Sequence, residues 1–171
     1  MTPRHPPTVI VLTGVSGSGK STVGKLLADR LDWEYAEADD FHPAANIAKM
    51  RAGIPLTDAD RMPWLHAIAA WIDERIAAGK PAVASCSALK RGYRDILRRP
   101  RVRTIYLDGD RELIAGRIAA RKGHFFPAAL LDSQFNDLER PQSDEETLSV
   151  PITGTADQTV QEIIKALGLN P

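Results

Sequence analysis

The chain has 171 residues, enough for one domain with a sizeable buried core. Lys and Arg together number 22, as do Asp and Glu, and the resulting zero net charge argues against electrostatic binding to nucleic acid or to a membrane surface. The single cysteine, Cys86, excludes an intramolecular disulfide, and no apolar run approaches the ~20 residues of a membrane span. We expect a cytoplasmic protein, because the Pro-rich stretch from Met1 to Pro7 also lacks the pattern of a signal peptide.

The first predicted element is a buried strand over Thr8 to Thr13, an apolar and β-branched run. The residues that follow it, Gly14-Val15-Ser16-Gly17-Ser18-Gly19-Lys20-Ser21, fit the pattern G-x-x-x-x-G-K-[ST] of a phosphate-binding loop. Beyond the loop, apolar residues at helical spacing up to Leu31 predict a helix. This strand–loop–helix context favours a phosphate site over the alternative, an ordinary glycine-rich turn.

The chemistry of the loop follows from its backbone. Glycines let successive N–H groups turn toward an anion, and the helix that begins there adds its positive end. Lys20 is expected to reach the β- and γ-phosphates of a nucleoside triphosphate, and the Ser21 hydroxyl to bind Mg²⁺. Thr22 completes the predicted nucleotide-binding residues of this segment.

Alternating strand and helix patterns continue along the chain. Apolar or β-branched runs predict further strands over 33–38, 82–86, 102–107 and 148–152. Helical spacing predicts helices over 43–52, 58–78, 110–121, 127–138 and 156–167, and a basic helix that ends at Arg98 before Pro100. Within 58–78, Pro63 is expected in the first helical turn.

This alternation predicts an α/β fold of the P-loop NTPase kind. The expected architecture is a five-stranded parallel sheet with helices on both faces and ligands at the carboxyl ends of the strands. The chain contains no internal repeat, low-complexity tract or convincing linker, so residues 1–171 are interpreted as a single domain.

Acidic residues follow the second predicted strand, at Glu37, Asp39 and Asp40. The sequence has no D-x-x-G or N-K-x-D, which a guanine-specific GTPase would use. We also expect no apolar strand to end in the Asp with which many ATPases hold Mg²⁺. Small-molecule kinases place acceptor-binding and metal-organising groups after the second strand, so the pattern favours that class. A nucleotide-gated binding protein without phosphoryl transfer remains an alternative.

Several longer stretches lie between residues 14 and 135. Besides the loop, they are Asp39-Asp40-Phe41-His42-Pro43, Asp60-Arg61-Met62-Pro63-Trp64, Cys86-Ser87-Ala88-Leu89-Lys90, Arg121-Lys122-Gly123-His124-Phe125-Phe126 and Ser133-Gln134-Phe135. In these stretches, and in their order and spacing, the chain resembles the gluconate kinase family of small-molecule P-loop kinases. The loop is shared by many families, whereas the His-Pro, Asp-Arg-x-Pro-Trp and Cys-Ser-Ala-Leu-Lys stretches together are much more specific.

The resemblance implies a nucleoside- and shikimate-kinase-like fold with a lid. It also implies transfer of the γ-phosphoryl group of ATP to the 6-hydroxyl of D-gluconate, with Mg²⁺. A related kinase for another small hydroxy acid, such as shikimate, is the nearest alternative. Glu37 stands where some members carry Asp, and its longer carboxylate is expected to organise Mg²⁺ through water.

Gluconate is a polyol with one carboxylate, so its site needs a cation, hydrogen-bonding groups and a carboxylate near the reacting hydroxyl. Asp39 is the candidate to orient that hydroxyl and accept its proton; the alternative is an exposed loop acid. His42 and Asn46, four apart on a predicted helix, are expected to bind polyol hydroxyls. For His42, helix capping or a buried hydrogen bond is the alternative.

Arg61 and Arg94 are the candidates for the substrate carboxylate, because a guanidinium pairs with it bidentately. Lys90 is a further cation expected near the substrate. For Arg61 the alternative is a structural ion pair with Asp58 or Asp60. For Arg94 it is the solvated face of a basic helix.

Arg117 and Arg121 are four apart and are expected to share one helix face, with His124 shortly after. This pattern resembles the lid of small-molecule kinases, over approximately 117–138, which closes over the phosphates. Both arginines are expected to bind the nucleotide, Arg121 to stabilise the transferring phosphoryl group, and His124 to contact substrate. The alternative is a solvated basic patch. The region of approximately 39–78 is expected to bind the acceptor.

The adenine site is weakly marked in the sequence. By analogy with related kinases, one wall is expected near Arg117 and the other in the turn from Thr153 to Ala156. Cys86 is expected to be buried at a strand end and not to act as a nucleophile. Dimers in the family are the only ground for expecting a homodimer.

Overall fold

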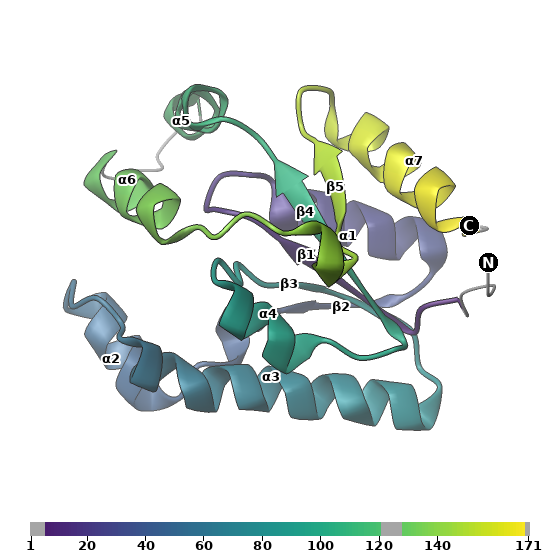
Figure 1. The fold of residues 1–171 in the computed structure, drawn as a ribbon, viewed down its shortest axis with the longest axis horizontal. Coiled ribbons are helices and arrows are strands. Elements are labelled where there is room, and N and C mark those ends of the chain that lie inside the picture. Colours follow the sequence, from purple (N-terminus) through teal and green to yellow (C-terminus); the bar gives the residue numbers. More distant parts are fainter. Residues whose placement is uncertain (1–5, 121–127, 170–171) are drawn as a thin grey trace.

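A computed structural model of the protein describes residues 6–120 and 128–169, and within them strands and helices alternate (Figure 1). The strands are β1 (Val9–Thr13), β2 (Glu34–Glu37), β3 (Ala82–Ser85), β4 (Val102–Asp108) and β5 (Leu148–Pro151). The α-helices are α1 (Lys20–Leu31), α2 (Ala44–Arg51), α3 (Asp58–Ala78), α4 (Arg91–Leu97), α5 (Arg111–Ala120), α6 (Ala128–Asp137) and α7 (Ala156–Leu167). Two 3₁₀ helices, which the sequence did not predict, are η1 (Ala38–Phe41) and η2 (Ser143–Glu145).

The strands form one parallel sheet of five strands, as predicted, and their order across it is β2-β3-β1-β4-β5. Strand β4 ends in Asp108 after the buried Ile105, Tyr106 and Leu107, so the expectation that no apolar strand ends in Asp was wrong. The central strand β1 pairs on both sides, and Leu12 lies opposite Ser85 of β3 and Ile105 of β4. Residues of β1 alternate between the two faces of the sheet and are buried on both, so the strand is an unbroken apolar run.

Helices cover both faces of the sheet, which confirms the predicted layering (Figure 1). On one face, Leu27 of α1 and Ile163 of α7 join Ile10 and Leu12 in a buried cluster. On the other face, α3 and α4 pack against the alternate residues of β1. Their buried cluster includes Val9, Val11, Leu65, Ile68 and Leu97.

Helix α3 begins with a capping box. The Thr57 hydroxyl accepts the backbone N–H of Asp60 at 3.1 Å, and the Asp60 carboxylate accepts that of Thr57 at 2.9 Å. Because these bonds fix the helix start at Asp58, Pro63 lies inside the helix, in its second turn. The prediction of Pro63 in the first turn was therefore wrong. At that position proline lacks the N–H that would bond the carbonyl of Ala59.

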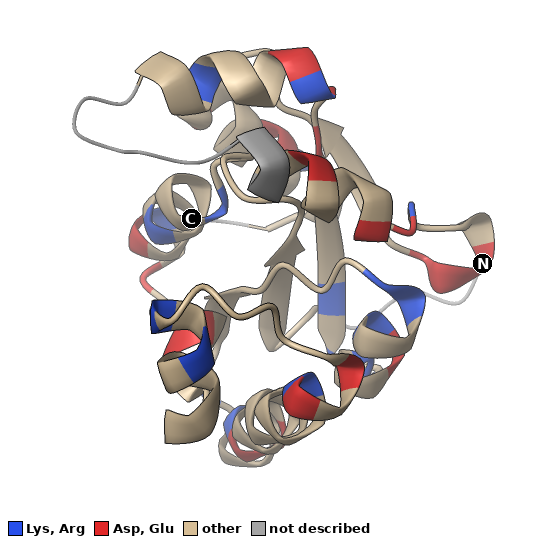
Figure 2. Ribbon diagram, turned by 90° about the vertical axis from the view of Figure 1, so that its left-hand side faces the viewer, with Lys and Arg blue, Asp and Glu red and all other residues tan. Residues whose placement is uncertain are grey.

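Positively and negatively charged residues are interspersed along the helices (Figure 2). Several join neighbouring elements as exposed ion pairs, for example Arg99 with Asp73 at 2.8 Å and Arg111 with Asp132 at 2.5 Å. Pairs of this kind each contribute little to stability. Within residues 6–120 and 128–169, no helix is long and apolar enough to cross a membrane.

Candidate active site

At the crevice between the carboxyl ends of β1 and β3, the connections that leave the two strands run toward opposite edges of the sheet. The connection after β1 leads to β2 on one side, and the connection after β3 leads to β4 on the other. Parallel sheets bind ligands at such a point. Two backbone bonds hold the strand ends together, from Cys86 N–H to the Leu12 carbonyl at 2.9 Å and from Gly14 N–H to the Ser87 carbonyl at 3.4 Å.

A cavity of about 430 Å³ opens at this crevice. It gathers predicted residues from separate parts of the chain: Ser16, Gly17, Gly19, Lys20, Ser21, Glu37, Asp39, His42 and Arg61 all line it. The phosphate-binding loop and the predicted acceptor residues therefore face one shared space.

The loop after β1 has the geometry of an anion site. Gly17 has φ +82°, and a Cβ there would lie 2.6 Å from the Ile118 side chain of α5, so only glycine fits. Gly19, at φ +92°, directly precedes Lys20, the first residue of α1. Helix α1, which lies wholly within the described residues, has no side-chain cap and no acid in its first turn. Its first N–H groups are thus left for an anion.

Lys20 lies against the loop that precedes it. Its Nζ donates to the carbonyl of Gly14 at 2.8 Å and to that of Val15 at 3.0 Å. Burial lowers the pKa of Lys20 to about 8, although Cys86 and the carboxylate of Asp39 favour the charged form. A phosphate group bound in the loop would place negative charge beside this buried ammonium group and would favour its protonated form.

The Glu37 carboxylate is oriented by Tyr35, a residue to which the sequence analysis gave no role. The Tyr35 hydroxyl donates to Glu37 Oε1 at 2.5 Å and lies 2.9 Å from Ser85 Oγ, which itself donates to the Lys20 carbonyl at 3.0 Å. Burial and the bond to Glu37 raise the pKa of Tyr35 to about 12, so the phenol keeps its proton. Glu37 is thereby held near the first turn of α1, where Ser21 lies.

The side of the cavity that carries the predicted acceptor residues is built on η1 and α3. Asp39 of η1 is exposed and lines the cavity. The His42 ring stacks on Trp64, with centroids 4.4 Å apart and planes at 10°. Trp64 in turn is fixed by donating its indole N–H to the Ala38 carbonyl at 2.7 Å. One aromatic support therefore positions both the histidine and the turn that carries Asp39.

Arg61 of α3 lines the cavity and donates to the Tyr93 hydroxyl at 3.2 Å. The aspartates considered as its ion-pair partners bind other cations. Asp60 pairs with Lys49 at 2.9 Å, and Asp58 accepts from Lys90 at 3.0 Å. Arg61 also borders an adjoining cavity of about 410 Å³, which Lys90 lines.

Two predicted substrate ligands lie elsewhere. Asn46 is 3% exposed and is absent from the lining of either cavity just described; its side chain bonds within the protein. Arg94 is also 3% exposed and pairs through Nε with Glu145 Oε1 at 2.7 Å and through Nη2 with Oε2 at 3.1 Å. Its Nη1 donates to the carbonyls of Ala88 and Leu89. These contacts contradict a direct substrate contact by Arg94 and also the solvated helix face.

The predicted walls of the adenine site come together on the other side of the loop. Arg117 of α5 donates to the carbonyls of Ile152 and, at 3.2 Å, Gly154. It borders a cavity of about 330 Å³, whose other lining includes Gly17, Gly19, Thr22, Gly154, Thr155 and Ala156. Arg121 and His124 lie outside the described residues.

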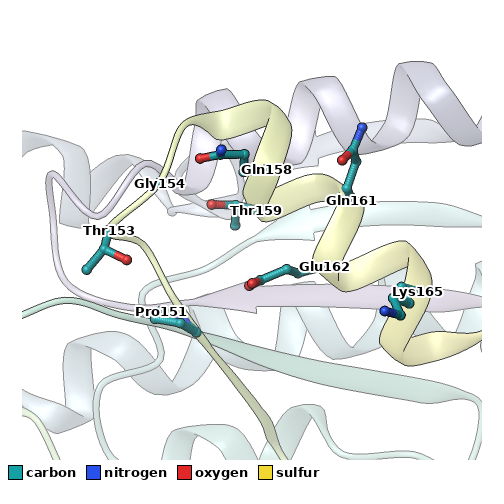
Figure 3. A pocket seen from close by; sticks show the side chains of 8 residues that line it. All are labelled: Pro151, Thr153, Gly154, Gln158, Thr159, Gln161, Glu162 and Lys165. Carbon is teal, nitrogen blue, oxygen red and sulfur yellow. The ribbon is translucent and has the colours of Figure 1, made fainter.

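A separate hollow of about 460 Å³ lies between the end of β5 and α7 (Figure 3). Its labelled side chains include Gln158, Glu162 and Lys165 of α7. Thr153 and Gly154, from the turn expected to form a wall of the adenine site, also line it, whereas the phosphate-binding loop and the predicted acceptor residues do not. It shares Gly154 with the cavity beside Arg117. The turn at Gly154 therefore lies between this hollow and the cavity beside Arg117.

Gln134 of α6 is a site residue to which the sequence analysis gave no role. Its Oε1 accepts the backbone N–H of Ser16 at 2.6 Å, and its Nε2 donates to the Ser16 hydroxyl at 2.7 Å. The available signal was the Ser133-Gln134-Phe135 stretch, which contributed to the resemblance without indicating a function. Helix α6 is thus fastened to the phosphate-binding loop.

Comparison with known proteins agrees with this geometry. Residues 9–141 match a family model described as an AAA domain. The chain is 45% identical over 161 residues to the gluconokinase of Gluconobacter oxydans, covering 93% of this chain and 90% of that protein. A gluconokinase structure from Sinorhizobium meliloti matches with a TM-score of 0.85 at 43% identity, covering 96% of this chain and 94% of that one. A shikimate kinase from Bacteroides thetaiotaomicron, with a TM-score of 0.67 at 18% identity over 95% of this chain and 99% of its own, shares the fold alone. The chain belongs to the gluconokinase family.

Proposed function

We propose that the protein transfers the γ-phosphoryl group of ATP to the 6-hydroxyl of D-gluconate, giving 6-phospho-D-gluconate and ADP. The observation that carries this proposal is the shared cavity, in which Lys20 of the phosphate-binding loop and Asp39 of η1 line the same space. Membership of the gluconokinase family is the ground for naming gluconate as the substrate. A shikimate kinase is the weaker candidate, because the likeness to that class extends only to the fold.

The donor half of the site holds the triphosphate. N–H groups of the loop and of the first turn of α1 would bind phosphate oxygens, and Lys20 would turn from the Gly14 and Val15 carbonyls toward the β- and γ-phosphates. Arg117 and the turn at Gly154 border the space proposed for the adenine. These groups hold the γ-phosphorus at a fixed place in the cavity.

The residues present fit Mg²⁺. Within the part of the chain that the structure describes, no cluster of three or more His, Cys, Asp or Glu side chains could hold a metal alone. Mg²⁺ needs no such cluster, since it is commonly held by one or two protein oxygens, phosphates and water. Ser21 would supply its hydroxyl, and Glu37, fixed by Tyr35, would bind metal-held water. When bound, the ion neutralises charge on the phosphate oxygens.

The acceptor half of the site orients gluconate. Arg61 would pair with the substrate carboxylate and His42 would bond a hydroxyl, which leaves the far end of the sugar acid for Asp39. The 6-oxygen forms a bond to the γ-phosphorus while the bond from that phosphorus to the β,γ-bridging oxygen breaks, and ADP leaves with the electron pair. Asp39 would accept the hydroxyl proton.

The region of approximately 117–138 is proposed as the lid and residues 1–171 as one domain. The contact of Gln134 with Ser16 supports the first idea, because it connects α6 to the loop that the lid would close over. The roles of Arg121 and His124, and a homodimer, remain predictions. Sedimentation of the full chain tests the dimer.

The proposed reaction is tested by ATP consumption with a panel of sugar acids and hydroxy acids that includes gluconate and shikimate. We expect ADP formation with gluconate, and ³¹P coupling in the product should place the phosphate on carbon 6. Turnover with a different acceptor and none with gluconate would overturn the substrate assignment. ATP binding without turnover on any acceptor would instead favour a nucleotide-gated binding protein.

Asp39→Asn tests the catalytic carboxylate. Because the amide cannot accept the proton, we expect turnover to fall by roughly 10²- to 10⁴-fold while the ATP dissociation constant stays within about twofold. Asp40→Asn is the matched control, since Asp40 is also an exposed acid of η1 but does not line the cavity. Near-normal turnover in Asp39→Asn, or equal losses in both variants, would remove Asp39 from this role.

A further inference from the structure

One partly buried contact defines which hydrogen-bonding group His42 can offer the substrate. The side-chain nitrogen of Asn46 lies 3.2 Å from His42 Nδ1 and 2.8 Å from the Asp60 carbonyl oxygen. We infer that Asn46 is a positioning residue, which holds His42 as the neutral tautomer protonated at Nε2 so that the ring donates one N–H to an acceptor oxygen of the sugar acid. The identity of that ligand rests on the proposed function.

The orientation of the Asn46 amide follows from its partners. A backbone carbonyl only accepts, so the Asn46 atom beside the Asp60 carbonyl must be the NH₂ group and not the amide oxygen. That nitrogen carries two hydrogens, one for the carbonyl and one for His42 Nδ1. Because Asn46 is 3% exposed, water competes little for either bond.

The Asp60 backbone is itself fixed, so the amide has a rigid anchor. Asp60 belongs to the capping box at the start of α3, and its carboxylate pairs with Lys49 of α2. Helices α2 and α3 are thus joined at the point from which Asn46 reaches His42. The amide cannot reverse without losing the bond to the carbonyl.

An N–H directed at Nδ1 determines the protonation state and the tautomer of the imidazole. Nδ1 must present its lone pair, and the neutral ring then carries its proton on Nε2. An imidazolium would place two donors against each other. Among the charged groups near the ring, Asp39 of η1 favours the proton and Arg61 of α3 opposes it, while burial has the largest effect and lowers the pKa of His42.

His42 and Asp39 therefore have different roles in the cavity. The Nδ1 atom contacts Asn46, which does not line the cavity that His42 lines, so the group left for a ligand is Nε2–H. This group donates to a hydroxyl or carboxylate oxygen and cannot accept a proton from it. Asp39 is then the group on this side of the cavity that serves as base, and His42 serves recognition only.

The tautomer is measured directly by long-range ¹H–¹⁵N correlation spectra of the imidazole nitrogens in the ligand-free wild-type chain. The His42 signals are assigned by their loss in His42→Gln, since the chain has 4 histidines. We expect the Nε2–H pattern at neutral pH, and a mixture of tautomers in Asn46→Ala. An Nδ1–H or imidazolium pattern in the wild type would overturn the inference, even if no variant of Asn46 folded. The spectra need no turnover, so this outcome is independent of the gluconate assay.

A pair of variants tests the donor in the reaction. The amide nitrogen of glutamine reaches the place of Nε2, whereas that of asparagine reaches only the place of Nδ1. We expect His42→Gln to keep the KM for gluconate within about threefold and His42→Asn to raise it about tenfold, the loss of one hydrogen bond, with the KM for ATP unchanged in both. Equal effects of the two variants on the gluconate KM, or a smaller effect of His42→Asn, would contradict a donor at Nε2.

Discussion

Among single residues, Lys20 has the clearest pH signature. Burial lowers the pKa of its ammonium group to about 8 in the ligand-free protein. Bound phosphate would favour the charged form and raise that pKa, so binding takes up a proton once the pH exceeds about 8. We expect the contribution of this group to ATP affinity to be complete below that pH and to fall by up to about tenfold per pH unit above it.

Calorimetric titration with ATP, in buffers of different ionisation enthalpy, measures both the affinity and the proton uptake. Lys20→Met is the control, and it should bind ATP more weakly and without the loss of affinity at high pH. Affinity that stays constant in the wild type up to pH about 10 would contradict a lowered pKa in the free protein.

The residue scale also shows which site residues a sequence can reveal. The place of Lys20 and Ser21 at the cavity was predictable because it depends on consecutive residues in one loop. Asn46 and Arg94 were not, because helical spacing places a polar side chain on a face without saying what covers that face. The partner of Arg94 is Glu145, 51 positions away and recognisable only once the chain has folded.

At the scale of elements, the position of α6 bears on nucleotide binding. Gln134 occupies the Ser16 N–H, a group of the loop that a phosphate oxygen would otherwise use. We expect Gln134→Ala to bind ATP roughly threefold to tenfold more tightly in the absence of acceptor, since one competing hydrogen bond of about 1 kcal/mol is removed. Equilibrium titration with ATP measures the change.

Asn136→Ala is the matched control for this prediction, because Asn136 is an exposed residue of the same helix. It should leave ATP affinity unchanged. Weaker ATP binding in Gln134→Ala would mean that the glutamine supports the loop in the ATP-bound state and does not compete with the nucleotide.

Most elements could be predicted because strands and helices here have regular apolar spacing. The prediction of 156–167 as a helix matches α7, Ala156–Leu167, whose start is set by a capping box at Thr155. The 3₁₀ helices η1 and η2 are too short to have a period. η1 is therefore missed by periodicity, although it carries Asp39.

In the whole molecule, the Arg94–Glu145 pair ties α4 to the segment before β5. Both side chains are nearly inaccessible, at 2% and 0% exposure. Glu145→Gln would leave the arginine buried without its counter-charge, and we expect the free energy of unfolding to fall by about 3–5 kcal/mol. Urea unfolding measures this. Asp144→Asn, which alters the exposed pair with Arg91, should cost under about 1 kcal/mol.

Acid should weaken the same pair. Burial alone would raise the pKa of Glu145, but hydrogen bonds from Arg94 and from the Gln142 backbone lower it below the usual value of 4.5. The stabilisation is therefore complete above pH 4.5 and is lost as the pH falls through the lowered value. The unfolding free energy of Glu145→Gln should decline less steeply than that of the wild type over this range. Equal acid dependence in the two proteins would place the titrating groups elsewhere.

Because Cys86 is buried, the alkylation rate of its thiol reports how often the sheet opens around it. The thiol is 1% exposed at the end of β3, burial raises its pKa to about 12, and it is the one cysteine of the chain. An alkylating reagent should therefore attack only when the sheet opens around the crevice, and its rate under native conditions measures the free energy of that opening. A cysteine introduced at exposed Ser133 of α6 would react at once in the folded protein. A fluorophore could thus be placed on α6 alone while Cys86 stays protected.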